Sequence, residues 1–173
     1  MQVLCTVESI ATYKAACNPF DLVSRPEDCR GCGSQGCFHR NGTYERYAGR
    51  ELIRVARFRC KHCGGSVSVL PDFLLPYRNL PLIEVDAYFR ATVEQRRERS
   101  GADLLRRYWR RWVEHCGRLQ RCHGSVQGGL ERDPLGFWRQ LGGSVGALAR
   151  EHGRLIDRYG LSLLGRYRCH AVA

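Results

Sequence analysis

The sequence has no apolar run long enough to cross a membrane and no basic leader at its N-terminus. A membrane-spanning helix needs about 20 predominantly apolar residues, and Thr6, Glu8 and Ser9 interrupt the apolar residues near the N-terminus. Internal repeats and low-complexity tracts are absent as well. These absences predict a cytoplasmic protein with reduced thiols and without a membrane partner.

Acidic residues and lysine are also in short supply. The chain has 17 Asp and Glu against 28 Lys and Arg, which gives a formal net charge of +11, and its lysines are Lys14 and Lys61. Arginine has a planar fork of donors that pairs bidentately with phosphate or guanine, although genomic base composition would also explain its excess over lysine. The charge itself predicts a polyanionic partner.

Residue patterns divide the chain into three segments. Residues 1–26 mix short apolar runs with breaks at Pro19 and Pro26, and they have no legible role. Residues 27–80 alternate in the manner of strands, whereas residues 81–173 are basic and have helical spacing. We therefore expect an α+β fold in which a small sheet precedes a helical region.

The strand-like segment predicts a hairpin and a third strand. Residues 43–48 and 52–58 alternate in polarity around a turn at Gly49. Residues 66–70 predict a further short strand. The next segment, residues 71–81, carries three prolines and reads as an extended linker.

Two helices are expected before Gly117. The first begins at Pro81 and stops at Ser100. The second covers residues 103–116, and Gly117 closes it. The residues on its apolar face are Leu104, Leu105, Tyr108, Trp109, Trp112, Val113 and Cys116.

The rest of the chain predicts a loop at residues 117–133 and two more helices. A short helix is expected at residues 135–141, and a last one at residues 145–159 with Ser144 as its cap. Apolar residues of the last helix repeat at three-and-four spacing up to Gly160. Self-association, or contact with a transposase, through this C-terminal helix is one expectation.

Two short motifs carry the clearest chemistry. Cys29-Arg-Gly-Cys32-Gly and Cys60-Lys-His-Cys63-Gly each place two cysteines on one tight turn, with glycine directly after the second. Zinc takes four tetrahedral ligands, and a two-residue gap lets both cysteines of a turn reach the same ion. The 27 residues between the pairs contain the hairpin that would bring the turns together. We expect one structural Zn²⁺ held by Cys29, Cys32, Cys60 and Cys63 in a small rubredoxin-like zinc ribbon.

Other interpretations of the cysteines remain open. Disulfides would need an oxidising compartment, and a single iron would suit the same four thiolates. A thioredoxin-like redox pair is excluded by context, since glycines and a strand follow each pair instead of a helix. Cys37 and His39 could replace one ligand of the first pair. A second, looser cluster is formed by His115, Cys116, Cys122 and His123, with Cys169 and His170 at the tail.

The second helix has a basic outer face. Between Arg90 and Arg121 there are ten Arg and four acidic residues, a local net charge of +6. Such a row can follow a phosphate backbone, and the alternative is an ordinary solvated surface. The aromatic residues share the apolar face, so we expect them in the core rather than as base-stacking platforms. The predicted nucleic-acid contacts are Arg106, Arg107, Arg110, Arg111, Arg118 and Arg121.

Catalysis is not expected. A four-ligand zinc site has no open position for water, so it gives no reason to expect hydrolysis. The segment after the cysteine motifs is too short and too helical for a nuclease fold with an acidic triad. His115 and Cys116 are adjacent on a helix and do not face each other, so they are a poor nucleophile and base pair.

Two stretches resemble a known type of domain. C-x-x-C-G, H-x-x-G and R-[FY]-x-C-x-x-C-G-x-[ST] occur here at residues 29–33, 39–42 and 57–66. This pattern is similar to the zinc ribbon of an uncharacterised bacterial family related to the N-terminal ribbons of insertion-sequence transposases. The resemblance covers residues 27–81 and implies the four cysteines as ligands, a following helix-turn-helix and binding to DNA ends. A trihelical unit needs three helices, whereas the sequence predicts two before Gly117.

The sequence thus predicts a non-catalytic zinc-ribbon DNA-binding protein associated with transposases or other mobile elements. The alternatives are a zinc-dependent protein-interaction module and a ribbon associated with RNA or the ribosome.

Overall fold

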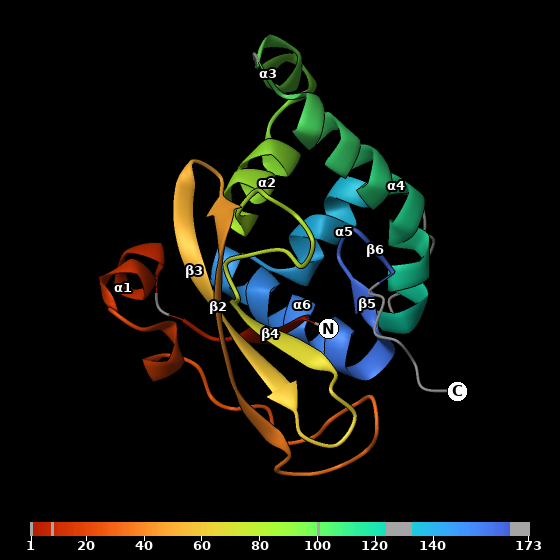
Figure 1. Cartoon of the computed structure of the whole chain (residues 1–173). Coiled ribbons are helices and arrows are strands. Elements are labelled where there is room, and N and C mark those ends of the chain that lie inside the picture. Colours follow the sequence, from red (N-terminus) through yellow and green to blue (C-terminus); the bar gives the residue numbers. More distant parts are fainter. Residues whose placement is uncertain (1, 8, 100, 124–132, 167–173) are drawn as a thin grey trace. The chain divides into compact units, whose positions relative to one another are not determined.

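The computed structural model describes residues 2–7, 9–99, 101–123 and 133–166. The chain divides into two compact units, a sheet unit that ends at Pro81 and a helical unit that begins at Leu82. Figure 1 shows the four-stranded sheet in the first unit and helices α2 to α6 in the second. The expected α+β class is confirmed.

A four-stranded sheet in the order β1-β4-β3-β2 forms the frame of the sheet unit. Its strands are β1 (Gln2–Cys5), β2 (Phe38–Ala48), β3 (Glu51–Cys60) and β4 (Ser66–Pro71). β1 runs parallel to β4, and the other neighbours are antiparallel. The predicted hairpin and third strand are confirmed, and the hairpin is longer than predicted because Phe38 still pairs with Cys60.

The first 26 residues, whose role the sequence left open, complete the core of the sheet unit. Phe20, in the short 3-10 helix η1 (Pro19–Asp21), packs edge-on against Phe58 with ring centroids 5.2 Å apart. In α1 (Ile10–Ala15), Tyr13 is buried and its hydroxyl donates to the Arg54 carbonyl at 2.9 Å. These contacts add apolar surface that a hairpin alone does not bury.

Residues 71–81 are not an extended linker, which corrects the prediction. Leu74 and Leu75 are buried, and the Arg46 guanidinium donates to the carbonyl groups of Leu75 and Arg78. The three prolines suggested an exposed connection. A segment without regular strand hydrogen bonds can nevertheless pack against a sheet when its leucine side chains are buried there.

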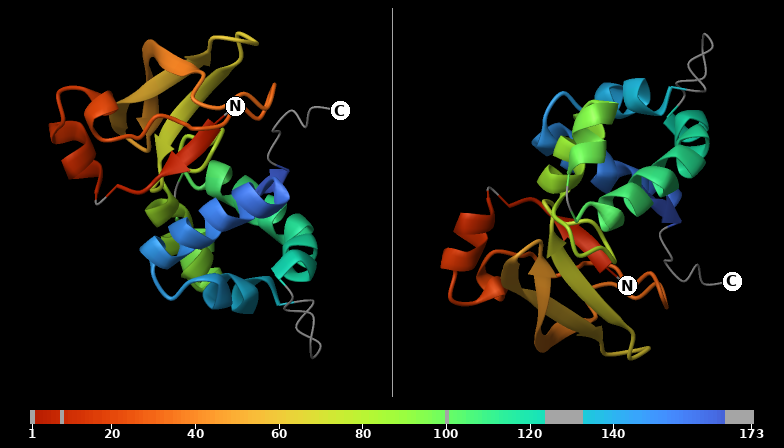
Figure 2. Two further views of the ribbon diagram at one scale, coloured as in Figure 1. Left: turned by 90° about the horizontal axis from the view of Figure 1, so that it is seen from below. Right: turned by 90° about the horizontal axis from the view of Figure 1, so that it is seen from above.

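The described part of the helical unit contains five helices: α2 (Leu82–Arg90), α3 (Val93–Glu98), α4 (Asp103–His123), α5 (Pro134–Leu141) and α6 (Val145–Tyr159). A two-residue pair of strands follows, β5 (Leu161–Ser162) and β6 (Gly165–Arg166). The two views of Figure 2 show α4 and α6 on either side of this unit's interior. Within the part of the chain that the structure describes, no helix has the length and apolarity needed to cross a membrane.

Aromatic rings fill the core of the helical unit. Trp112 stacks on Phe137 with centroids 5.6 Å apart and meets Trp138 edge-on at 4.9 Å. Phe89 lies 4.6 Å from the Trp138 ring. The indole of Trp138 donates to a carboxylate oxygen of Asp86 at 2.8 Å, so this buried acidic side chain has a partner.

Two helix boundaries in this unit differ from the prediction. The first predicted helix is two helices, because Thr92 caps α3 by accepting from the Gln95 backbone N–H while the Gln95 side chain accepts from the Thr92 N–H. The second does not end at Gly117 but runs on to His123. A mid-helix glycine costs only about 1 kcal/mol, and the fully buried Leu119 side chain in the following turn offsets it.

The last two helices are where they were expected. α5 begins at Pro134 behind an Asp133 cap, and α6 begins after Ser144, whose hydroxyl accepts from the Ala147 N–H at 3.2 Å. Gly160 ends α6 in the left-handed conformation. The prediction of a loop at residues 117–133 is wrong for residues 117–123, which continue α4. Residues 124–132 lie outside the described residues.

Candidate metal centre and basic helix

The sheet topology brings the two cysteine pairs together. Cys29 and Cys32 lie on a turn before β2, Cys60 is the last residue of β3, and Cys63 lies on the turn into β4. Antiparallel pairing of β2 with β3 sets Phe38 opposite Cys60 and so returns the chain to the first turn. Ligands that are 28 residues or more apart in sequence thus meet at one end of the hairpin.

The four sulfur atoms have the spacing of a metal tetrahedron. The Sγ atoms of Cys29 and Cys63 are 3.6 Å apart, and those of Cys32 and Cys60 are 3.7 Å apart. All four sulfurs lie within 4.8 Å of one another. Four thiolates at about 2.3 Å from a central ion would be about 3.8 Å apart. The site can therefore hold one metal ion, which confirms the predicted cysteine cluster.

Both turns have the same backbone design. The Gly33 N–H donates to the Cys29 carbonyl at 2.7 Å, and the Gly64 N–H donates to the Cys60 carbonyl at 3.1 Å. Gly33 and Gly64 have φ angles of +71° and +72°, a region that residues with a Cβ rarely adopt. The glycine after each second cysteine is therefore required by the turn.

The surroundings favour the thiolate form that a metal needs at two of the four cysteines, Cys60 and Cys32, whereas sulfur contacts with Cys29 and Cys60 raise the pKa of the Cys63 thiol to about 12. Hydrogen bonding from the backbone N–H of Cys63 lowers the pKa of the Cys60 thiol to about 6. The Ser34 side chain, which lies 3.3 Å from the Cys32 sulfur, lowers the pKa of that thiol as well. Cys29 and Cys60 are buried, whereas Cys32 and Cys63 are exposed.

A fifth sulfur lies beside the cluster but outside it. The Sγ atom of Cys37 is buried, 3.4 Å from that of Cys60, and donates to the Ser34 carbonyl at 3.2 Å. Burial raises the pKa of the Cys37 thiol to about 11, so this group stays protonated at neutral pH. Neither Cys37 nor His39 belongs to the four-ligand group, which leaves the alternative ligand role without support.

The looser second cluster is not brought together in the described part of the chain, where the four sheet cysteines are the one group with metal-ligand geometry. Cys116 is buried in the core, and its thiol donates to the Val113 carbonyl at 3.3 Å. Burial raises the pKa of that thiol. The side chain of His123 and the whole of Cys169 and His170 lie outside the described residues.

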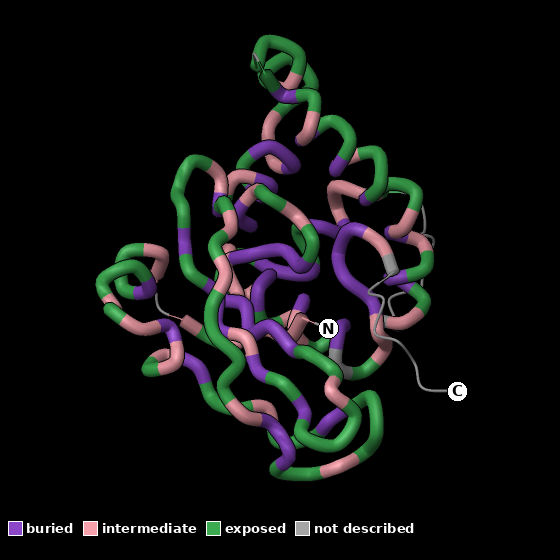
Figure 3. The backbone as a smooth tube through the Cα atoms, viewed as in Figure 1, coloured by how far each residue is buried: buried purple, intermediate pink, exposed green. Residues whose placement is uncertain are grey.

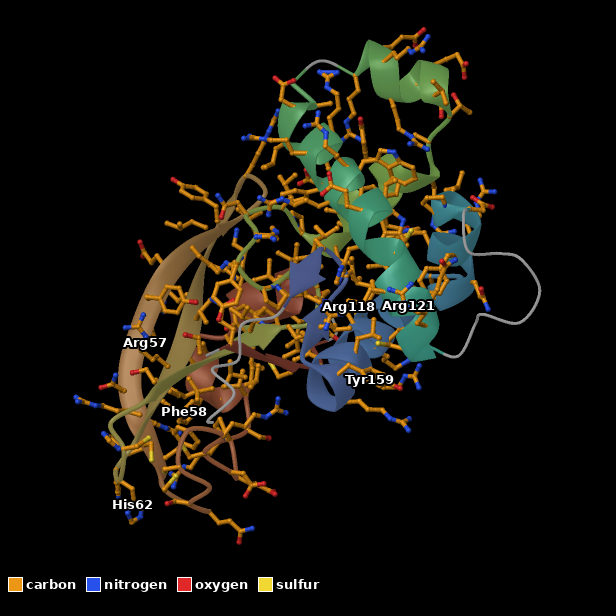
Figure 4. The ribbon with its side chains drawn as sticks, turned by 90° about the vertical axis from the view of Figure 1, so that its right-hand side faces the viewer. Arg57, Phe58, His62, Arg118, Arg121 and Tyr159 are labelled. Atoms are coloured by element: carbon orange, nitrogen blue, oxygen red, sulfur yellow. The ribbon has the colours of Figure 1, made fainter. Side chains whose placement is uncertain are left out.

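The helix α4 presents two opposite faces. Its buried face consists of Leu105, Tyr108, Trp112, Cys116 and Leu119. Its exposed face carries all six predicted arginines, Arg106, Arg107, Arg110, Arg111, Arg118 and Arg121. Figure 4 labels Arg118 and Arg121 on this helix, and the tube of Figure 3 shows how exposed residues recur along it.

Most of these arginines have no acidic partner. Arg106 lies 3.1 Å from Asp103, and both side chains are largely exposed. Among the described residues, the other five arginines of the face form no ion pair. Exposed ion pairs are weak, so the positive charge of α4 is available to a ligand.

The apolar face differs in detail from the prediction. Val113 is 42% exposed and does not belong to the core. Trp109 is only half-buried, with the Arg96 guanidinium 4.2 Å above its ring. Arg96 also donates to the carbonyls of Ala91 and Phe89 at 3.0 and 3.2 Å, so it joins the α2–α3 connection to α4. Local sequence patterns do not predict this contact, because 13 residues separate the two side chains.

One family model matches this chain. Residues 29–112 match a domain of unknown function (DUF6431). The match begins at the first metal-site cysteine and ends at Trp112 in the middle of α4, so it spans the whole candidate metal centre and the first half of the basic helix. No curated protein matches the chain. No solved structure matches it either.

Proposed function

We propose that the protein is a non-catalytic, zinc-stabilised DNA-binding protein whose α4 contacts the phosphates of duplex DNA. The observation that carries the proposal is the exposed arginine face of α4. It is held in a fixed orientation by the buried face of the same helix, on which Trp112 has no exposed surface.

The chemistry of the metal site supports zinc. Four thiolates in a tetrahedron at the end of a small sheet are typical of structural zinc sites, and iron is the alternative for the same ligands. All four positions are filled by protein, so a bound ion would have no place for a water or substrate. The ion would stabilise the fold and leave ligand binding to other residues.

The dimensions of α4 favour duplex DNA over folded RNA. From Arg107 to Arg121 the helix rises about 21 Å. The major groove of B-form DNA, about 12 Å wide, admits a helix, whereas that of A-form RNA is deep and narrow. Arginines on one face of a helix in such a groove would reach phosphates on both of its edges.

The association with transposases and mobile elements remains part of the proposal. It is supported by the cysteine motifs and by the three helices, α2, α3 and α4, that follow the sheet unit where the sequence predicted two. Three helices are the number that a helix-turn-helix unit needs. RNA binding is the main alternative, and competition with structured RNA distinguishes it.

Self-association through α6 has less support. Of the residues whose spacing suggested it, Leu148, His152 and Leu155 are fully covered within the helical unit, and Val145 and Tyr159 are half-buried. An apolar face that is already packed is not available to a partner.

The proposal is tested by removing charge from the middle of α4. Arg110→Gln with Arg118→Gln should weaken binding to a 20-base-pair duplex and reduce the slope of log Kd against log salt by about two, because two phosphate contacts are lost. The matched control, Arg139→Gln with Arg150→Gln, removes two exposed arginines from α5 and α6 of the same unit. Fluorescence anisotropy at several salt concentrations measures both, and equal affinities of the two variants would overturn the role of α4.

A further inference from the structure

A second basic surface lies on the sheet unit, at the end that carries the metal centre. Strand register sets His39, Arg59 and Ser66 opposite one another on β2, β3 and β4, and sets Arg57 opposite Ser68. Residues that face each other across strands, or alternate along one strand, share a face of the sheet. We call His39, Arg57, Arg59 and Ser66 the basic sheet face; these residues are exposed or half-buried, whereas Ser68 is buried.

The turn beyond β3 extends this basic surface. Lys61 and His62 occupy the two positions between Cys60 and Cys63, and both are exposed. Figure 4 labels Arg57 on β3 and His62 on the turn that follows this strand. Among the described residues, Lys61 forms no ion pair.

Both arginines of the basic sheet face are held in place. The Arg59 Nε donates to the Gly64 carbonyl at 3.2 Å, and a Cβ on Gly64 would lie 3.5 Å from Arg59 Nη2, so the guanidinium packs over the second cysteine turn. The Arg57 guanidinium lies 4.9 Å above the ring of Tyr44. A side chain that is already ordered loses less entropy when it binds a ligand.

A simpler explanation is that these cations only balance the negative charge of a four-thiolate site. Such a role would place the guanidinium against sulfur. Arg59 instead donates to a carbonyl, and within the described residues neither the Arg59 nor the Lys61 side chain forms a hydrogen bond to sulfur. One N–H of Arg59 is used in this bond, and its other four N–H donors suit phosphate oxygens.

We propose that Arg59 and Lys61 form a second phosphate-binding surface, so that the protein holds duplex DNA through both of its units. This inference rests on the proposed function and names a further contact for it. Because the second cysteine turn positions Arg59 and carries Lys61, the surface is complete only when that turn is folded.

The test compares two double variants with the same net charge. Arg59→Gln with Lys61→Gln removes the proposed contacts. Lys14→Gln with Arg50→Gln is the control, since both residues are exposed and lie at the other end of the hairpin, where Lys14 pairs with Glu51. Both variants lose two positive charges, so a general effect of charge weakens both alike. Because the ends of β3 are about 30 Å apart, a contact at the metal end is lost only in the Arg59/Lys61 variant.

The expected result is specific to the metal end. Against a 20-base-pair duplex, the Arg59/Lys61 variant should bind at least about fivefold more weakly than the control at 100 mM salt, with a salt slope smaller by one to two. Metal content equal to that of the parent shows that its cysteine turns are folded. If this variant binds like the control while the α4 variant is weakened, the inference is wrong and the proposed function stands. If the parent binds no duplex at low salt, the proposed function itself is wrong.

Discussion

The sheet unit and the helical unit are stabilised in different ways. In the helical unit, the interlocked rings of Phe89, Trp112, Phe137 and Trp138 form a core that does not depend on any bound group. In the sheet unit, apolar packing covers the strands, but the end of the hairpin converges on four cysteines. The turns at that end have little apolar surface to bury. A metal ion bound to these cysteines would supply there the cross-link that hydrophobic contacts supply in the other unit.

The largest difference between the units should appear when the metal is lost. Cys29→Ser or Cys63→Ser removes a ligand, and structural zinc sites in small peptides contribute on the order of 10 kcal/mol to folding. We expect the sheet unit to unfold in either variant while the helical unit keeps its helices. Elemental analysis measures the metal content, circular dichroism at 222 nm measures the helix content, and hydrogen exchange measures the unfolding of the sheet unit.

The control for this experiment is Cys17→Ser, because Cys17 is exposed and lies outside the cluster. It should leave metal content and stability unchanged. A parent protein that carries neither zinc nor iron after purification under reducing conditions would contradict the metal site.

Truncation of the aromatic core should affect the helical unit and spare the metal. Trp112→Ala should cost about 3 to 5 kcal/mol, as is usual for a fully buried large side chain, whereas Trp109→Ala should cost clearly less because its ring is only half-buried. Denaturant unfolding gives both values, and metal content reports on the sheet unit. Equal losses of unfolding free energy in the two variants would mean that Trp109 is buried as deeply as Trp112.

Acid should weaken the helical unit through His152. This side chain is fully buried, and within the described residues neither of its ring nitrogens has a hydrogen-bond partner. Burial lowers the pKa of His152 from 6.5 to about 3. Below pH 6.5 the unfolded state therefore binds a proton that the folded state excludes, so stability falls as the pH drops from 6.5 toward 3.

The expected loss is about 2 kcal/mol between pH 7 and pH 5. His152→Leu should remove most of this dependence, whereas replacement of the exposed His62 by Gln should leave it unchanged. Unfolding curves of the helical unit between pH 5 and pH 7 measure the effect. If the unfolding free energy of the parent protein did not change between pH 5 and pH 7, His152 would not be a buried neutral side chain.

Local sequence predicted those features that depend on neighbouring residues. The two cysteine turns follow from a two-residue spacing and a following glycine, and Ser144 and Gly160 mark the ends of α6 by their capping chemistry. The arginine face of α4 follows from helical periodicity alone. The residues of the capping box at Thr92 are present in the sequence. The helical spacing of apolar residues continues on both sides of them, so the sequence did not predict that one helix ends and another begins there.

Features that depend on distant partners were missed or wrong. The sequence does not show that residues 71–81 cover the sheet, that β1 pairs with β4, or that α4 continues past Gly117. Val113 and Trp109 fit the apolar stripe by spacing, yet one is exposed and the other lies under Arg96. In each case, burial depends on which element packs alongside.

Spacing and backbone preference act over a few residues, so they were enough to predict the candidate metal ligands, the turn geometry that presents them and the arginine face of α4. The three-dimensional fold was needed to show that the four sulfurs lie within 4.8 Å of one another, that Cys37 lies beside them with a pKa raised by burial, and that Arg59 is anchored on the second cysteine turn. These relations join residues that strand pairing and the fold of each turn bring together, and a side chain's environment is set by those contacts rather than by its position in the chain.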